Sequence, residues 1–473
     1  MPPENENPAR RIPSIDALLQ DAELREATAS VPRAVVVSAV RGAAEEVRNA
    51  ILEGGAEYAD EPAIRAAILE RVCDRVRTAT SPHFCKAINA TGIILHTGLG
   101  RAVLAPRALR QIQDELSGYS VVQLDTETGK RSRRDGRIEW LLQQLAGAEA
   151  ATVVNNNAAA TLIVLNTVAA GKEVIVSRGQ LVEIGGSFRL PEVMAASGAR
   201  LVEVGTTNRT HPRDYENAVT EHTAAIMRVH PSNYVISGFT AEVSLEELEK
   251  IAHAHGLVLI DDVGAGALVD LSRFGFRREP TLPESVRAGA DLVTCSADKL
   301  IGASQAGLIL GKAALVNAVR KNPLARAVRV GKLTLAALEA TLMLFLDEPT
   351  ALDEVPTLRM LRRELSDIAA QAERIAHSVR QQVADRIGRV ETIDGFSQMG
   401  SGSLPEQDLP TRLVALSSRT ISADQMALRL REQTPPVFAR IEENRVLIDP
   451  RTLLEGEEGI LVVAIIEAFS PEK

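Results

Sequence analysis

The chain has 473 residues, of which 45% are hydrophobic and 24% charged, and its formal net charge is −9. This length is too great for one compact core, so we expect two or three domains. The acidic balance argues against a surface generally coated with nucleic acid, and no apolar run approaches the ~20 residues of a membrane-spanning helix.

The three cysteines, Cys73, Cys85 and Cys295, are scattered and lack the spacing of a metal site, so no metal is expected. They fit a reducing compartment, where cysteine behaves as a small buried hydrophobe. The start of the chain, Met1–Asn5, lacks the basic-then-apolar pattern of a signal peptide. We therefore expect a cytoplasmic protein with no membrane partner.

Residues 14 to 80 predict a small all-helical unit ahead of the main body. Ile15, Leu18 and Leu19 keep helical spacing, and a second helical stripe runs through residues 64–72. Gly54-Gly55 indicates a turn between the helices. We expect a first domain over residues 1–86.

From Ile88 the pattern changes to strands that alternate with helices. Strands bounded by helices at this spacing predict a mostly parallel sheet covered on both faces, in a domain over residues 87–334. The helix after Ser244 opens on a capping box, Ser244-Leu245-Glu246-Glu247. The expected strands are 152–154, 174–176, 201–204, 225–229 and 257–260, and the expected helices are 138–147, 158–170 and 244–256.

Beyond about Leu333 the chain first turns helical and then gives short strands. This order predicts a smaller α+β domain over residues 335–473. A last apolar run near Ile460 reads as a helix or a strand. The expected helices are 358–363 and 371–384, and the expected strands are 413–416 and 445–448.

Lys299 lies between two short apolar segments, within the run Val293–Gly307 that leads to Leu308–Gly311. Small residues surround it. A lysine at such a strand exit can lose its proton and form a Schiff base with an aldehyde cofactor. If the Ser-x-Asp-Lys pattern is considered alone, Lys299 could instead be a solvated lysine in a loop with no catalytic role.

Two strand ends earlier in the chain carry polar groups that fit a phosphorylated pyridine. Asn155-Asn156-Asn157 opens a helix and forms an anion site from free backbone N–H groups, or else a simple N-cap. Asp262 ends another expected strand, where a carboxylate can hold a protonated pyridine nitrogen; otherwise Asp261 and Asp262 are turn carboxylates. The order of phosphate turn, aspartate and lysine is that of fold-type I pyridoxal-phosphate (PLP) enzymes.

Arginines supply candidate ligands for a second anion. Arg101 follows the run His96-Thr97-Gly98-Leu99-Gly100, while Arg326 and Arg329 share one face if their segment is helical. Guanidinium forks match a tetrahedral oxyanion. A surface role is the alternative for each arginine.

The chain closely resembles the bacterial selenocysteine synthases, which are L-seryl-tRNA(Sec) selenium transferases. The resemblance covers nearly the whole chain and implies an α/β fold-type I PLP-dependent transferase of the aspartate-aminotransferase type. The resembling runs are 12–19, 88–97, 155–160, 176–179, 181–186, 204–211, 298–300, 335–341 and 400–405.

The resemblance implies roles for individual residues. Lys299 carries the PLP and is catalytic, and Asp298 lies beside the reacting centre. Asp262 contacts the pyridine nitrogen. The other expected cofactor-binding residues are Asn156, Asn157, Ala158 and Ser296. The expected substrate-binding residues are Arg101, Arg326 and Arg329, which hold the selenium donor, and Asn233, which is a pocket candidate from its place after His230.

The implied reaction converts seryl-tRNA(Sec) to selenocysteinyl-tRNA(Sec). The serine hydroxyl leaves by β-elimination, and selenium is then added from selenophosphate. The amino-terminal helical unit would bind the body of the tRNA, and the subunits would assemble as a ring of dimers, typically a homodecamer.

Departures and alternatives remain at this stage. The chain has Gly98, Ala303 and Ser304 where the family has other small or amide residues, and Ala303 needs a turn that tolerates a Cβ atom. One alternative is a PLP-dependent lyase or transferase for a small phosphorylated amino acid or amino sugar, which would not need the helical unit. Another is a catalytically idle tRNA-binding scaffold. The cluster Lys130–Arg134 favours a solvated loop over an RNA-contact or substrate-entry role.

Overall fold

The computed structural model describes residues 11–53, 60–186, 188–383, 388–404 and 407–469. The chain forms two compact units, Met1–Lys86 and Ala87–Lys473. Two of the segments interpreted from sequence, Met1–Asn5 and Gly54-Gly55, lie outside the described residues. Within the described residues, no helix combines the length and the apolarity that crossing a bilayer requires.

The first unit consists of helices that pack through one apolar stripe each. Val40 and Val47 of α3 pack in one buried cluster with Ile64 and Val72 of α4. Asp60 caps α4, because its carboxylate accepts a hydrogen bond from the Ala63 N–H. The helices are α1 (Ile15–Leu19), α2 (Ala22–Ala27), α3 (Arg33–Leu52) and α4 (Glu61–Thr80), which confirms the helical character expected for residues 14–80.

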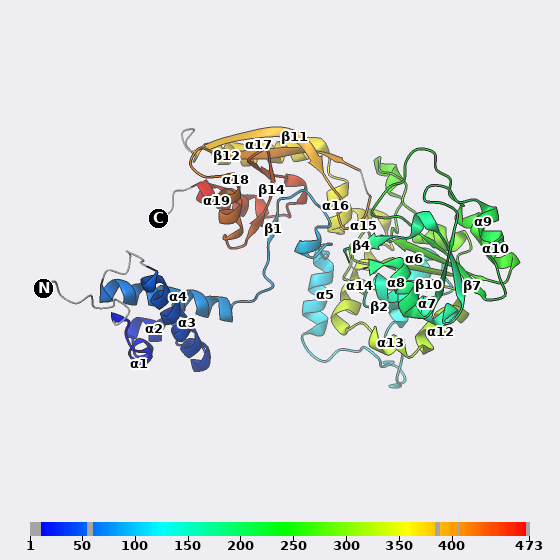
Figure 1. Cartoon of the computed structure of the whole chain (residues 1–473), viewed down its shortest axis with the longest axis horizontal. Helices are drawn as coiled ribbons and strands as arrows, with labels where there is room; N and C mark the ends of the chain where they lie inside the picture. The colour runs from blue at the N-terminus through cyan, green and yellow to red at the C-terminus, as the bar shows by residue number, and fades with distance from the viewer. Residues whose placement is uncertain (1–10, 54–59, 187, 384–387, 405–406, 470–473) are drawn as a thin grey trace. The chain divides into compact units, whose positions relative to one another are not determined.

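A seven-stranded sheet forms the centre of the second unit (Figure 1). Its strand order is β2-β10-β9-β8-β7-β3-β6, in which β10 alone runs antiparallel to its neighbours and the other pairs are parallel. The expected mostly parallel sheet is confirmed. The strands are β2 (Ala150–Val154), β3 (Glu173–Ser177), β6 (Arg200–Val204), β7 (Thr223–Val229), β8 (Val258–Gly264), β9 (Leu292–Ser296) and β10 (Gly307–Gly311).

Both faces of this sheet are covered by helices. Alternate residues of β3 enter different cores: Ile175 packs with α6, α10, α11 and α14, while Val174 and Val176 pack with α7, α8 and α12. The strands therefore read as continuous apolar runs. The covering helices are α6 (Gly136–Ala146), α7 (Asn157–Ala169), α8 (Leu190–Ser197), α10 (Leu245–Ala254), α11 (Leu282–Arg287), α12 (Ala313–Lys321) and α14 (Lys332–Leu344).

The carboxyl-terminal part contains a second, antiparallel sheet in the order β11-β12-β15-β14, beside α17, α18 and α19 (Figure 1). The short strand β1 (Ile88–Asn89) joins this region, because it pairs in parallel with β13 (Val437–Phe438). The elements are β11 (Gly388–Ser397), β12 (Leu409–Ser418), β14 (Arg440–Glu442), β15 (Arg445–Ile448), α17 (Leu365–Arg380), α18 (Ala423–Arg431) and α19 (Glu457–Phe469).

Shorter elements connect these layers. A domain boundary at 334/335 stays a prediction, and α14 spans that position with Leu335 and Leu338 packed in the core of the large sheet. The remaining elements are α5 (Pro106–Leu116), α9 (Pro212–Glu216), α13 (Leu324–Ala327), α15 (Glu348–Glu354), α16 (Pro356–Leu361), β4 (Glu183–Ile184) and β5 (Phe188–Arg189).

Several local expectations need correction. β8 continues to Gly264, so Asp261 and Asp262 lie inside the strand and do not follow it. For the last apolar run the sequence left a helix and a strand open, and the structure shows the helix α19. Helix α13 ends at Ala327, so Arg329 lies outside it, where it forms an isolated bridge with Val154.

Candidate active site

Lys299 lies in the tight turn between β9 and β10, where it is 6% exposed. The turn is closed by backbone hydrogen bonds from Ala297 N–H to the Ala306 carbonyl (2.9 Å) and from Gly302 N–H to the Lys299 carbonyl (3.0 Å). Gly302 has a φ of +73°, whereas the neighbouring Ala303 is not among the residues with positive φ. The turn therefore tolerates the Cβ atom of Ala303, as expected.

The surroundings of Lys299 favour its neutral amine. Burial lowers the pKa of Lys299 below its usual value, and the nearby guanidinium of Arg101 lowers it further. Carboxylates at Asp298, Asp262 and Glu279 oppose the shift without reversing it. A neutral, buried amine is the form that attacks an aldehyde or removes a proton.

Asp262 lines the same cavity and is held by groups from α7 and β8. Its Oδ1 accepts hydrogen bonds from Asn157 Nδ2 (2.8 Å) and Gly264 N–H (3.2 Å), and its Oδ2 accepts one from Thr161 Oγ1 (3.2 Å). Burial raises the pKa of Asp262, and these hydrogen bonds partly offset the rise. A buried carboxylate fixed in this way is a ready partner for a cationic ring nitrogen.

The asparagine turn connects the end of β2 to the start of α7. Asn156 is the N-cap, and its Oδ1 accepts a hydrogen bond from Ala159 N–H at 2.9 Å. Asn157 reaches Asp262 instead, so the run serves as a cap and also supports the carboxylate. Gly307 lets β10 approach this turn, because a Cβ atom there would lie 2.1 Å from the Asn156 carbonyl oxygen.

These residues enclose one cavity of about 280 Å³. It contains Lys299 and the start of α7, where the Ala159 N–H is capped by Asn156 and the N–H groups of Asn157 and Ala158 have no intrahelical acceptor and suit a phosphate. Two buried polar atoms on its wall, Ser232 Oγ and Asn157 Oδ1, have no hydrogen-bond partner among the described residues. Of the residues expected from sequence, the cavity brings together Arg101, Asn156, Asn157, Ala158, Asp262, Ser296, Asp298 and Lys299.

The cavity fits PLP by the chemistry of its walls. An amine for the aldehyde, a carboxylate for the pyridine nitrogen and a helix start for the phosphate face one space. Sequence reasoning did not identify Ser232 and Gln305 on the wall or Thr161 against Asp262. Thr161 lies four residues after Asn157 on the expected helix, and that spacing could have indicated that both side chains reach the same group.

The three expected arginines lie in two places. Arg101, with a φ of +64°, lines the cavity, and its Nη1 donates a hydrogen bond to Asp298 Oδ2 at 2.7 Å. Arg326 and Arg329 do not line the cavity of this chain. They lie near Arg134, whose pKa is lowered by burial and then by these two guanidinium groups. The three arginines are therefore near one another, although Arg134 also donates hydrogen bonds to the Val330 carbonyl oxygen and to Gln123 Oε1.

Their segment adjoins the back of the asparagine turn. The Asn155 N–H donates to the Val328 carbonyl oxygen at 3.0 Å, so the arginine segment and the phosphate turn are joined through the backbone. Asn233 also lies outside the lining, and its Nδ2 donates to the Glu183 carbonyl oxygen at 2.8 Å. Its neighbour Ser232 occupies the wall instead.

Asp261 has a structural role that differs from that of Asp262. Its two carboxylate oxygens accept hydrogen bonds from Arg228 Nε and Nη2, each at 2.7 Å. Because successive side chains of a strand point to opposite faces, Asp261 faces away from the cavity side of β8. It is thus a buried ion-pair residue and not a turn carboxylate.

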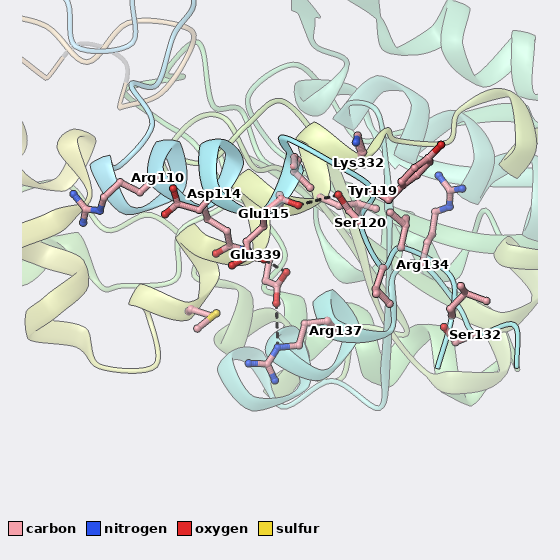
Figure 2. Close-up of a pocket in the computed structure, with 18 of the residues that line it drawn as sticks. Arg110, Asp114, Glu115, Tyr119, Ser120, Ser132, Arg134, Arg137, Lys332 and Glu339 are labelled. Carbon is pink, nitrogen blue, oxygen red and sulfur yellow. Dashed lines mark hydrogen bonds and ion pairs between the residues drawn. The ribbon is translucent and has the colours of Figure 1, made fainter. Parts of the chain in front are cut away.

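A larger hollow of about 870 Å³ lies between α5, the loop after it, α6 and α14. Figure 2 shows Arg134 and Tyr119 on one side of it, and Glu339 paired with Arg137 on the other. Arg133 pairs with Glu139, and Arg134 donates to the Val330 carbonyl oxygen at 2.8 Å. The Lys130–Arg134 cluster is therefore anchored to the protein at these two arginines.

No group of three or more metal-ligating side chains occurs in the part of the chain that the structure describes.

Comparison with known proteins identifies related sequences over almost the full length. The family model described as L-seryl-tRNA selenium transferase matches residues 87–454, and the model described as selenocysteine synthase N terminal matches residues 9–48. The chain is 46% identical over 460 residues to the L-seryl-tRNA(Sec) selenium transferase of Geobacter sulfurreducens, covering 97% of this chain and 99% of that relative. It is 47% identical over 471 residues to the enzyme of that name from Solidesulfovibrio magneticus, covering 99% of both.

Among solved structures, the D-glucosaminate-6-phosphate ammonia-lyase is similar to this chain with a TM-score of 0.53 and 21% sequence identity. The match covers 82% of this chain and 96% of that one. At this identity the likeness shows a shared fold.

Proposed function

The chain belongs to the L-seryl-tRNA selenium transferase family, and we propose that it converts seryl-tRNA(Sec) to selenocysteinyl-tRNA(Sec) with PLP as its cofactor. The observation that carries the proposal is one cavity in which Lys299, Asp262 and the asparagine turn meet. An idle binding scaffold would have no need for a buried lysine of lowered pKa beside a fixed carboxylate.

PLP, once bound, supplies an electron sink for β-elimination of the serine hydroxyl. Lys299 is the attachment point and, in its neutral form, the base that removes the Cα proton of the seryl group. Asp262 keeps the ring nitrogen charged, and Asn157 keeps Asp262 in place. The first turn of α7, with Asn156 and Ala158, holds the phosphate.

Arg101 and the cluster of Arg326, Arg329 and Arg134 supply the binding groups for selenophosphate. Arg101 is already at the cavity, where Asp298 orients it. The other three lie behind the asparagine turn, joined to it through the Asn155–Val328 hydrogen bond. A guanidinium group at the cavity, as at Arg101, would hold a phosphate-like anion near Cβ and raise its local concentration.

The first unit is proposed to bind the tRNA, since its residues 9–48 match the amino-terminal model of the same family. A cytoplasmic location follows from an aminoacyl-tRNA substrate. Assembly into a homodecamer is part of the same proposal, and the exposed apolar side chains of Tyr119, Val121 and Leu124 support contact with another copy. No observation specifically favours the alternative of a lyase for small phosphorylated substrates. The structural similarity to the ammonia-lyase shows a shared fold and nothing about the substrate.

A single assay tests the proposed function. The full chain is incubated with PLP, seryl-tRNA(Sec) and selenophosphate, and the aminoacyl group is identified by mass. We expect selenocysteine with the wild-type chain and unchanged serine with Lys299→Ala. Unchanged serine with the wild-type chain, or turnover of a small phosphorylated amino acid in its place, would contradict the proposal.

A further inference from the structure

The wall of the Lys299 cavity contains a buried acid–imidazole pair to which the proposed function gives no role. His230 follows β7 and lines the cavity, and its Nε2 lies 3.0 Å from Glu279 Oε2. Glu279 is 5% exposed, and among the described residues His230 is the only side chain that hydrogen-bonds to it. A carboxylate buried this deeply requires such a partner, so the pair fixes the imidazole ring.

The second nitrogen of that ring is free to contact a ligand. His230 Nδ1 makes no hydrogen bond within the described part of the chain, and it is not among the buried atoms that lack a partner, so it keeps some exposed surface. His230 lines the Lys299 cavity and also two shallower hollows beside it. The backbone places the residue firmly, because His230 N–H donates to the Asp262 carbonyl oxygen at 2.9 Å. One ring nitrogen is therefore held by Glu279 while the other remains open.

The strand order decides which part of the cofactor His230 meets. The asparagine turn follows β2, Lys299 follows β9, Asp262 lies in β8 and His230 follows β7, in the spatial order β2-β10-β9-β8-β7. His230 thus lies across Lys299 and Asp262 from the phosphate turn. In the pyridoxal ring, the carbon that bears the phosphate arm and the carbon that bears the hydroxyl flank the aldehyde carbon on opposite sides. A cofactor bound with its phosphate at α7 and its aldehyde at Lys299 would turn its ring oxygen toward β7.

We propose that Glu279 is a positioning residue that orients His230 so that Nδ1–H donates a hydrogen bond to the C3 oxygen of PLP. In this arrangement Nε2 contacts Glu279 and Nδ1–H contacts the ring oxygen, so both ring nitrogens have a hydrogen-bond partner. Two acceptors flanking one imidazole satisfy all its donors. The proposal rests on the proposed function for the identity of the cofactor.

The test compares the affinities of two cofactors and needs no turnover. Dissociation constants of the full chain are measured for PLP and for 3-deoxypyridoxal 5′-phosphate, which lacks the C3 oxygen, and their ratio is the readout. His230→Phe is expected to reduce the preference for PLP by roughly tenfold or more, the value of one hydrogen bond to a charged group. Glu279→Gln is expected to reduce the preference for PLP severalfold, because His230 is then less well oriented. If the Glu279→Gln protein does not fold, Glu279→Asp is measured in its place.

A matched control is available elsewhere in the fold. Glu249 contacts His253 Nδ1 at 2.8 Å, away from the cavity, so Glu249→Gln should leave the preference unchanged. If His230→Phe prefers PLP as strongly as the wild-type chain does, the proposal is overturned. If the preference for PLP falls in His230→Phe but in neither Glu279 variant, Glu279 has no positioning role. Failure of the wild-type chain to bind PLP at all would instead contradict the proposed function.

Discussion

Replacing Gly307 by alanine tests whether the asparagine turn shapes the cofactor site. Gly307 begins β10, and a Cβ atom there would lie 2.1 Å from the Asn156 carbonyl oxygen and 2.9 Å from the Asn157 backbone nitrogen. Normal packing requires the turn to retreat by about 1 Å, and overpacking of this kind costs roughly 1–3 kcal/mol of folding free energy. The same displacement moves Asn157 away from Asp262 and disturbs the start of α7.

We therefore expect Gly307→Ala to lower the free energy of unfolding by about 1–3 kcal/mol in urea. We expect PLP affinity to fall by about tenfold or more, because misplacement by 1 Å disrupts a preorganised site. Gly459→Ala is the control: Gly459 lies exposed in α19 with open space around it, so alanine there should be neutral or stabilise by up to about 1 kcal/mol. Wild-type stability and PLP affinity in Gly307→Ala would refute the reasoning.

Three further predictions concern charges at the site. Asp262→Asn should retain the cofactor but slow elimination from seryl-tRNA(Sec) in single-turnover assays by about 100-fold or more, since the ring nitrogen loses its counter-charge; an unchanged rate would contradict this role. Arg326→Ala should raise the KM for selenophosphate by about tenfold without changing the affinity for seryl-tRNA(Sec), and an unaltered KM would remove Arg326 from the donor site. Burial holds the pKa of Lys299 in the folded protein below its usual 10.5. At a pH between the folded and the unfolded pKa, the lysine is protonated only in the unfolded chain, so the free energy of unfolding rises with pH in this range. Lys299→Met should thus stabilise the cofactor-free protein in urea more at pH 7 than at pH 10, and equal effects at both would contradict the lowered pKa.

The centre of the site could be predicted from sequence because each of its groups lies in the last residues of a strand or shortly after one. Lys299, Asp262 and Asn157 come from three separate strands, and parallel topology brings the carboxyl ends of such strands to one edge. Glu279 could not be found in this way. It comes from a loop without regular spacing, and its contact with His230 depends on the tertiary fold alone.

Other misses have local physical causes. β11 contains Arg389, Glu391 and Asp394, so its apolar alternation is weak and no strand was expected there. The run near Ile460 is rich in β-branched residues, so the sequence left a helix and a strand open there. In the fold, Leu461, Ala464, Ile465 and Ala468 are buried at spacings of three and four residues, and this periodicity belongs to a helix.

The position of the arginines illustrates what one chain's sequence cannot fix. A spacing of three residues suggested one helical face for Arg326 and Arg329, but α13 ends between them and the chain continues as a bridge to Val154. Arg134, far away in sequence, joins them through the fold. Charge clusters of this kind depend on loop geometry, which carries weaker sequence patterns than helices and strands.

The central claim is that the cofactor aldehyde is attached to the amine of Lys299. Borohydride reduction of the PLP-loaded protein fixes the aldehyde to the amine that carries it, and peptide mass spectrometry then locates the pyridoxyl group. We predict a single labelled peptide containing Lys299. Label on a different lysine, with the Lys299 peptide unmodified, would contradict the account.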